Sequence, residues 1–127
     1  MDWIDDTVAV GNLIDGVSEH RHRQEGIDII IDARVLFTQS TLPFRRTPIM
    51  ESLLMARNRL VDISPLEPKV LIFCNRGRDR SSFVAMLYVS KRYGMSYQEA
   101  YKLVRSKRMQ TAFHWDWVEV MERAKPP

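Results

Sequence analysis

The only cysteine of the chain, Cys74, is followed six residues later by Arg80 and then by Ser81. A short turn between such residues directs several backbone N–H groups inward, and these form a binding site for a tetrahedral oxyanion. The guanidinium of Arg80 can donate two parallel hydrogen bonds to that anion, and a thiolate beside it can attack phosphorus. The spacing therefore predicts a phosphate site in which Cys74 is the reactive group. The residues expected to bind the phosphate are Asn75, Arg76, Gly77, Arg78, Asp79 and Arg80.

Two regular elements must position this turn. Residues 69–73 (KVLIF) indicate a buried strand, and residues 81–92 indicate a helix that is apolar on every side and therefore packed in the interior. A strand that leads in and a helix that leads out place the turn where α/β proteins bind their ligands. The positive end of the helix dipole would stabilise the Cys74 thiolate, and Gly77 allows the backbone to turn tightly.

The rest of the chain alternates strands and helices. A strand is expected at residues 7–10, ended by a turn at Gly11-Asn12, and a buried strand at residues 27–33. Residues 35–47 have no clear period and are expected to form a loop with a short strand. The alternation predicts an α/β fold with a central, mainly parallel sheet of about four to five strands flanked by helices.

The expected helices begin at recognisable capping residues. Ser18 caps one helix, Thr47 with Pro48 at the first helical position begins a second, and the capping box of Ser96 and Glu99 begins a third. The apolar stripe of the second helix consists of Ile49, Leu53, Ala56, Leu60 and Ile63. A final helix is marked by Phe113, Trp117, Val120, Met121 and Ala124.

Composition limits the class of protein. The chain has 127 residues, of which 45% are hydrophobic and 28% charged, so we expect one domain spanning residues 1–127. The longest uncharged stretches have ten residues, too few to span a bilayer, and the acidic N-terminus lacks a signal-peptide pattern. One cysteine excludes an internal disulfide framework and a thiolate cluster for zinc. We therefore expect a cytoplasmic protein without cofactor, metal or membrane partner, and monomeric by default.

Charge is divided unevenly along the chain. Residues 1–64 carry 7 Arg and 10 Asp or Glu, a net charge of −3, whereas residues 65–127 carry 12 Lys or Arg and 6 Asp or Glu, a net charge of +6. The two halves sum to the overall +3. A basic C-terminal half indicates an anionic partner, either a small phosphate or a nucleic acid.

The segment around Cys74 resembles the signature loop of the cysteine-dependent protein tyrosine phosphatase superfamily, in its small dual-specificity branch. The other segments similar to that branch are residues 7–12, 26–32 and 95–108. The resemblance extends over nearly the whole chain, with residues 35–64 the poorest match, and it implies a single phosphatase-like domain.

This resemblance implies roles for individual residues. Cys74 would be the nucleophile, Arg80 the phosphate clamp, and Ser81 would stabilise the thiolate as it leaves the phosphocysteine. Gln110 with Thr111 lies where many members have a loop that positions the attacking water.

Two departures from the family concern catalysis. The residue before the cysteine is Phe73, where the family usually has a histidine that helps to lower the thiol pKa. Residues 35–60 contain no aspartate, although the general acid of the family normally lies there. The candidates for that acid are Glu51 first, then Asp79 in the loop, then Asp32 at the end of a strand.

The predicted reaction is metal-independent hydrolysis of a phosphomonoester through a cysteinyl-phosphate intermediate. A phosphorylated protein, on tyrosine and/or serine and threonine, is the first substrate class. Arg45, Arg46, Arg76 and Arg78 could favour a polyanion, so an inositol phosphate or an RNA 5′-phosphate stays open. Two alternatives are a catalytically weak or inactive phosphate-binding pseudophosphatase and, less favoured, a basic nucleic-acid-binding domain.

The histidines are interpreted as structural. His20 and His22 are two residues apart on a polar helix and face different sides, which does not suit a metal pair. His114 stands beside Trp115 and close to Trp117, and we expect it to be a packing or capping residue.

Overall fold

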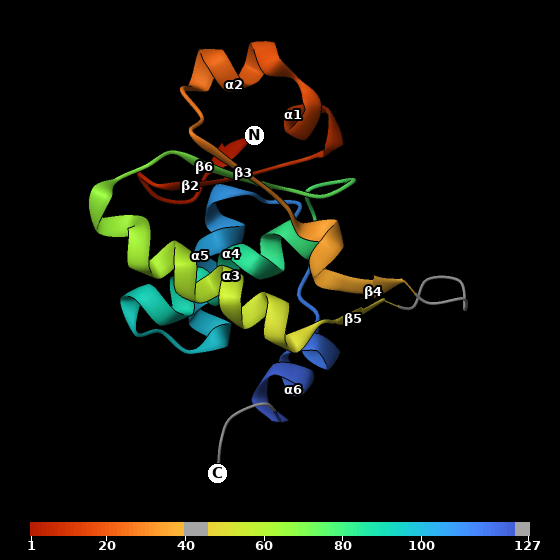
Figure 1. Cartoon of the computed structure of the whole chain (residues 1–127). Coiled ribbons are helices and arrows are strands. Elements are labelled where there is room, and N and C mark those ends of the chain that lie inside the picture. The colour runs from red at the N-terminus through yellow and green to blue at the C-terminus, as the bar shows by residue number, and fades with distance from the viewer. Residues whose placement is uncertain (40–45, 124–127) are drawn as a thin grey trace.

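The computed structural model describes residues 1–39 and 46–123. Its main sheet has four strands in the order β1-β2-β6-β3 (Figure 1). These are β1 (Asp2–Trp3), β2 (Val8–Gly11), β3 (Ile29–Asp32) and β6 (Val70–Phe73). Strands β2, β6 and β3 run parallel, and β1 is antiparallel to β2. The predicted α/β fold with a mainly parallel sheet is confirmed.

Helices lie on both sides of this sheet (Figure 1). On one side are α1 (Leu13–Val17) and α2 (Glu19–Glu25). On the other are α3 (Met50–Ile63), α4 (Arg80–Tyr93), α5 (Tyr97–Lys107) and α6 (Trp115–Arg123). Two short 3-10 helices are η1 (Ala33–Leu36) and η2 (Ser64–Leu66).

The core forms between the sheet and α4. Every residue of β2 and β6 is buried, and α4 is buried from Arg80 to Val89. Helix α4 packs against β6 and β2 on one side and against α3 and α5 on the others, which explains why its sequence is apolar all round. Because the loop from Cys74 ends in this buried helix, the core fixes both ends of the loop.

Strand β3 is less buried than predicted. Ile29 is 39% exposed and Ile30 is 44% exposed. Strand β3 lies at the end of the strand order and pairs with β6 alone among the strands of the sheet. The β-branched sequence indicates a strand correctly, but burial depends on its place in the sheet, which local sequence does not contain.

The segment before α3 contains a pair of strands, where a loop with one short strand and then a helix start at Thr47 were expected. Its two antiparallel strands are β4 (Phe37–Gln39) and β5 (Arg46–Pro48). Thr47 and Pro48 therefore belong to a strand, and α3 begins only at Met50. The Thr38 hydroxyl donates to the carbonyl of Thr47 and accepts from its N–H, both at 3.2 Å, and this pairing outweighs the local preference for a helix start.

Asn12 begins a helix where the sequence suggested only a turn. Its side chain accepts a hydrogen bond from the N–H of Asp15, and the Asp15 carboxylate accepts from the N–H of Asn12, a complete capping box for α1. Two other predicted positions, Arg45 and Ala124, lie outside the described residues.

Candidate active site

The loop that begins at Cys74 lies between the carboxyl end of β6 and the N-terminus of α4, as predicted. Cys74 is 2% exposed, and its Sγ atom lies 3.1 Å from the Oγ atom of Ser81. The backbone N–H of Ser81 donates to the same sulfur at 3.4 Å. The thiol is therefore in direct contact with the first turn of a buried helix.

The pKa of the Cys74 thiol lies below its ordinary value. Burial alone would raise this pKa, but several groups outweigh burial: the Ser81 hydroxyl, the backbone N–H groups of Ser81 and Gly77, and the charge of Arg80. The thiolate is the nucleophilic form of cysteine, so this environment increases the reactive fraction at neutral pH. The ring of Phe73 is not among the groups that lower this pKa.

We expect Cys74 to be alkylated at a lower pH than an ordinary cysteine, whose thiol pKa is about 8.5. Ser81→Ala should move the midpoint of the alkylation rate to higher pH, because it removes the hydroxyl that contacts the sulfur. The measurement is the rate of iodoacetamide labelling between pH 5 and about 10, a range that brackets the ordinary thiol pKa.

Ser82→Ala is the matched control for this titration. The Ser82 hydroxyl contacts the Thr111 hydroxyl at 3.1 Å and the carbonyl of Gly77 at 3.5 Å, and not the sulfur, so its removal should leave the midpoint unchanged. Inorganic phosphate should protect the thiol in every variant. A wild-type midpoint at or above the ordinary value would show that the loop does not activate Cys74.

Gly77 shapes the loop through a close approach to the neighbouring strand. Its φ of 62° lies in the left-handed region, and a Cβ atom at this position would come within 2.5 Å of the carbonyl oxygen of Gly11. Only glycine fits such a position without strain. The carbonyl of Gly77 accepts a hydrogen bond from the Nε atom of Arg108, which is itself buried. The loop is thereby held against β2 and is also hydrogen-bonded to Arg108.

The segment between α5 and α6 braces the loop at further points. The N–H of Ala112 donates to the carbonyl of Arg78 at 3.0 Å, and Thr111 is hydrogen-bonded to Ser82. Of the pair expected to position water, Thr111 is buried in this contact while Gln110 is exposed. The structure therefore brings Thr111 to the base of α4 and leaves Gln110 free to reach solvent near the loop.

Arg80 is the first residue of α4 and is 4% exposed. Among residues 1–39 and 46–123, no hydrogen bond or ion pair engages its guanidinium. Burial and the charge of Arg46 lower the pKa of Arg80, but an arginine remains protonated in proteins. A buried cation whose donors are unused next to a thiol is suited to bind an anion.

An arginine packs against Phe73, the residue that precedes the cysteine. The guanidinium of Arg34 lies over the ring of Phe73, with its carbon 5.5 Å from the ring centroid. Arg34 also donates to the side-chain oxygen of Asn75 at 3.2 Å and, through two nitrogens at 2.9 Å each, to the carboxylate of Asp32. This chain therefore places a positive charge beside the loop where Phe73 itself carries none.

The three candidates for the general acid lie in different surroundings. Glu51 is exposed in the first turn of α3, and no hydrogen bond joins it to the described part of the loop. Asp32 is held by Arg34, whose hydrogen bonds keep the pKa of this carboxyl below its usual range, so it stays ionised. Asp79 contacts His114 through one oxygen, at 2.7 Å, and Arg78 through the other, at 3.4 Å.

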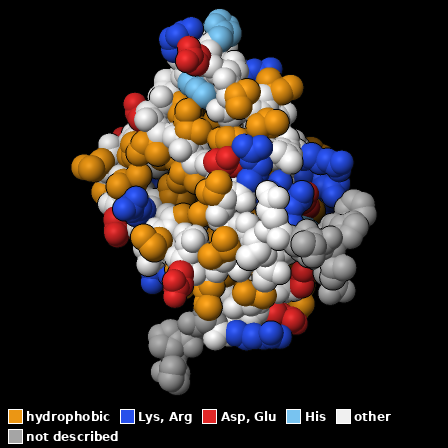
Figure 2. All heavy atoms as spheres, turned by 45° about the vertical axis from the view of Figure 1, so that its right-hand side comes forward, with side chains coloured by type: hydrophobic (Ala, Val, Ile, Leu, Met, Phe, Trp, Pro, Cys, Tyr) orange, Lys and Arg blue, Asp and Glu red, His pale blue; other side chains and the backbone are white. Residues whose placement is uncertain are grey.

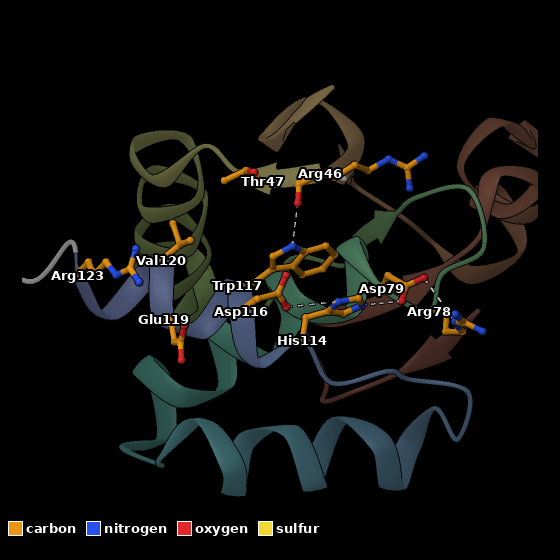
Figure 3. Close-up of a pocket in the computed structure, with 10 residues that line it drawn as sticks. All are labelled: Arg46, Thr47, Arg78, Asp79, His114, Asp116, Trp117, Glu119, Val120 and Arg123. Atoms are coloured by element: carbon orange, nitrogen blue, oxygen red, sulfur yellow. Dashed lines mark hydrogen bonds and ion pairs between the residues drawn. The ribbon is translucent and has the colours of Figure 1, made fainter. Parts of the chain in front are cut away.

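The contact between His114 and Asp79 was not predicted. His114 does pack, because its ring stacks on Trp117 with the centroids 3.8 Å apart and the planes at 14°. It also reaches the loop across 35 residues of sequence, a distance at which no local pattern could reveal the partner. Both residues line a cavity of about 690 Å³, which we call the α6 cavity (Figure 3). Its other walls include Arg46 and Thr47 of β5.

The surface around the loop is basic. Arg46, Arg76 and Arg78 are exposed. Figure 2 shows a group of Lys and Arg side chains on the side of the molecule where β6 ends. Basic charge at the mouth of an anion site raises the local concentration of anionic ligands.

No group of three or more His, Cys, Asp or Glu side chains within residues 1–39 and 46–123 is arranged to hold a metal ion. In the same part of the chain, none of the helices has the length and apolar character needed to cross a membrane.

Comparison with protein families gives one match, to the dual specificity phosphatase catalytic domain, over residues 9–122. The matched range contains the whole loop from Cys74 to Ser81. No curated protein matches the chain.

Solved structures with the same fold include human DUSP28, with a TM-score of 0.77 and 15% sequence identity, covering 98% of this chain and 96% of that one. The human tyrosine phosphatase-like serine/threonine/tyrosine-interacting protein has a TM-score of 0.75 and 17% identity, covering 97% and 93%. PTPMT1 in complex with PI(5)P has a TM-score of 0.75 and 17% identity, covering 94% and 90%. At these identities the likeness establishes the fold.

Proposed function

The chain belongs to the family of dual specificity phosphatase catalytic domains, and from this premise we propose that residues 1–127 form one phosphatase domain. It hydrolyses phosphate monoesters through a cysteinyl-phosphate intermediate, with Cys74 as nucleophile and Arg80 as phosphate clamp. The observation that carries this proposal is the pairing of a buried thiol of lowered pKa with a buried arginine whose guanidinium donates to no other residue in the described ranges 1–39 and 46–123.

The loop suits both halves of the reaction. In the first half, the Cys74 sulfur forms a bond to phosphorus while the bond to the ester oxygen breaks, and the loop N–H groups and Arg80 bind the three equatorial oxygens. In the second half, water attacks phosphorus and the thiolate leaves. The Ser81 hydroxyl, 3.1 Å from the sulfur, stabilises the departing thiolate, and Gln110 is the exposed side chain that could orient the water.

The substrate is a phosphorylated molecule, as in the rest of the family. Phosphotyrosine should be a better substrate than phosphoserine or phosphothreonine, because a phenolate can leave without a proton and an alkoxide cannot. None of the three candidate acids is free to donate a proton at the loop. Glu51 is exposed on α3, Asp32 is ionised, and both oxygens of Asp79 already contact nitrogen atoms. A second candidate function is a phosphate-binding module without turnover, which the absence of aspartate from residues 35–60 favours.

We expect the protein to hydrolyse activated aryl phosphates in the presence of a metal chelator. Alkyl phosphates should react more slowly by at least the factor that a general acid supplies, about 10²–10⁴. An aryl group leaves as a stabilised phenolate, whereas an alkoxide needs a proton. The measurement is phosphate release from p-nitrophenyl phosphate and from a phosphoserine peptide.

Two variants test the source of the proton. Glu51→Gln should change neither rate, because its carboxylate is exposed and forms no hydrogen bond with the described part of the loop. A loss confined to the alkyl substrate in Glu51→Gln, or in Asp79→Asn, would assign the acid to that residue and contradict the expectation. No release from either substrate, together with tight phosphate binding, would favour the binding module.

A further inference from the structure

The α6 cavity opens beside the phosphate loop, and the reaction described above leaves it unoccupied. One end is formed by Arg46 of β5 and Arg78 of the loop. Figure 3 shows both side chains extending past Asp79 toward the same side of the cavity. Arg46 is also close enough to Arg80 for its charge to lower the pKa of that guanidinium. The cavity therefore borders the loop through Arg78 and Asp79, and the charge of Arg46 in its wall acts on Arg80.

Arg46 and Arg78 carry the positive charges at this end of the cavity. The carboxylate of Asp79 is shared between His114 and Arg78, at 2.7 and 3.4 Å. Arg46 forms no ion pair with another described residue, and its backbone carbonyl is held by the Trp117 Nε1 atom at 3.0 Å. Asp116 lies beside His114, with its Oδ1 atom 3.9 Å from the Nδ1 atom of that ring, whereas Glu119 and Arg123 of α6 line the opposite end (Figure 3). A group that leaves the phosphate clamp toward Arg46 and Arg78 thus meets cations.

None of the three candidate acids, all within the described residues, is a free proton donor beside the loop, and this limits which groups can leave. Without an acid, the leaving oxygen departs as an anion, and its ease of departure follows the pKa of its conjugate acid. That pKa is about 10 for a tyrosine phenol and much higher for an alcohol, but only about 6 for a phosphate monoester. A phosphate is the leaving group that least needs a proton.

We propose that this protein cleaves phosphoanhydrides, removing the terminal phosphate of a di- or triphosphate, with Arg46 and Arg78 binding the phosphate that leaves. The inference rests on the proposed function and names its substrate class. It joins two independent observations, the absence of a placed acid and the cations at the cavity end, and each of them favours an anionic leaving group.

The step balances without an additional reactant. The Cys74 thiolate forms a sulfur–phosphorus bond to the terminal phosphorus, and the bond from that phosphorus to the bridging oxygen breaks. The electron pair stays on the bridging oxygen, which leaves as part of a phosphate whose added charge faces Arg46 and Arg78. Water then releases inorganic phosphate from Cys74.

The test compares kcat/KM for inorganic triphosphate, ATP and an RNA carrying a 5′-triphosphate with kcat/KM for p-nitrophenyl phosphate and an alkyl phosphate, all in chelator. We expect at least one triphosphate to exceed the alkyl phosphate by about 10²-fold or more, the scale of the missing acid contribution. The three triphosphates distinguish a free polyphosphate, a nucleotide and an RNA end as its source.

Variants separate this proposal from the general phosphatase activity. Arg46→Gln should lower the ratio of triphosphate to p-nitrophenyl phosphate hydrolysis by about tenfold or more, because one charge-assisted contact to a phosphate is worth about 1.5–3 kcal/mol. Arg105→Gln, an exposed arginine on α5, is the matched control and should leave the ratio unchanged. Loss of hydrolysis in Cys74→Ser would show that the activity does not come from contaminating phosphatases.

Each outcome decides one of the two proposals. Hydrolysis of p-nitrophenyl phosphate without hydrolysis of any triphosphate would overturn the phosphoanhydride proposal and leave the phosphatase standing. Equal ratios in Arg46→Gln and Arg105→Gln would also overturn it, because the leaving phosphate would then not meet Arg46. If no substrate reacts in a Cys74-dependent manner, the proposed phosphatase function itself fails.

Discussion

Replacing Cys74 with serine should reduce turnover of every substrate by about 10⁴-fold or more, the scale on which removing a covalent nucleophile acts. A serine hydroxyl is not ionised by the groups that activate the thiol, so no attacking anion forms at the base of the loop. The measurement is phosphate release by wild type and variant at equal concentration, with trapping of the phosphocysteine in the wild type.

Phosphate binding should survive this change. The loop N–H groups and Arg80 do not depend on the sulfur, and Ser81 can hydrogen-bond to a serine oxygen in place of the Cys74 sulfur. Calorimetric titration with inorganic phosphate should therefore give similar affinities for the two proteins. Turnover in Cys74→Ser above about a hundredth of the wild-type rate would contradict the assigned nucleophile, given the size of the loss expected for its removal.

Arg80→Lys should lower kcat by about 10²–10³-fold, although the charge is retained. The guanidinium can bind two equatorial oxygens at once, while an ammonium binds as a point charge on a flexible chain. Arg80 is 4% exposed at the start of α4, so the protein holds this fork in one orientation before substrate arrives. The measurement is kcat for p-nitrophenyl phosphate and for a poorer aryl leaving group.

Both substrates should lose the same factor in Arg80→Lys, because Arg80 binds the transferred phosphoryl group and not the leaving group. Arg105→Lys, on the exposed surface of α5, controls for the exchange of an arginine for a lysine. Near-normal turnover in Arg80→Lys would refute the clamp, and a loss that depends on the leaving group would move Arg80 to a different role.

Sequence determined those parts of this protein whose structure follows from the residues of one segment alone. Residues 70–73 are apolar and β-branched, and residues 81–89 are apolar on every side, so a buried strand and a buried helix follow from local composition. The spacing from Cys74 to Arg80, with Gly77 between them, then leaves a tight turn at a helix N-terminus. The resemblance to the phosphatase family began at that segment and extended over nearly the whole chain.

Several features depended on tertiary contacts that no single segment contains. Thr47 and Pro48 have the local signature of a helix start, yet pairing with β4 makes them a strand. Strand β3 was predicted to be buried, but its position at the sheet edge exposes Ile29 and Ile30. The strand pairing of Thr47 outweighed a local preference of about 1 kcal/mol or less per residue, and the exposure of β3 follows from its position in the sheet and not from its sequence.

The surroundings of the catalytic loop show the same division. Sequence predicted the thiol and the arginine as the reactive pair, because both lie in one loop. It could not place His114 against Asp79 or Arg34 over Phe73, or bring the charge of Arg46 to act on Arg80, since each pair joins residues more than 30 positions apart. Sequence alone therefore determined the spacing on which the prediction of phosphate binding and attack rests. Only the tertiary structure decided which charges surround the loop, because electrostatic contacts act through space and not along the chain.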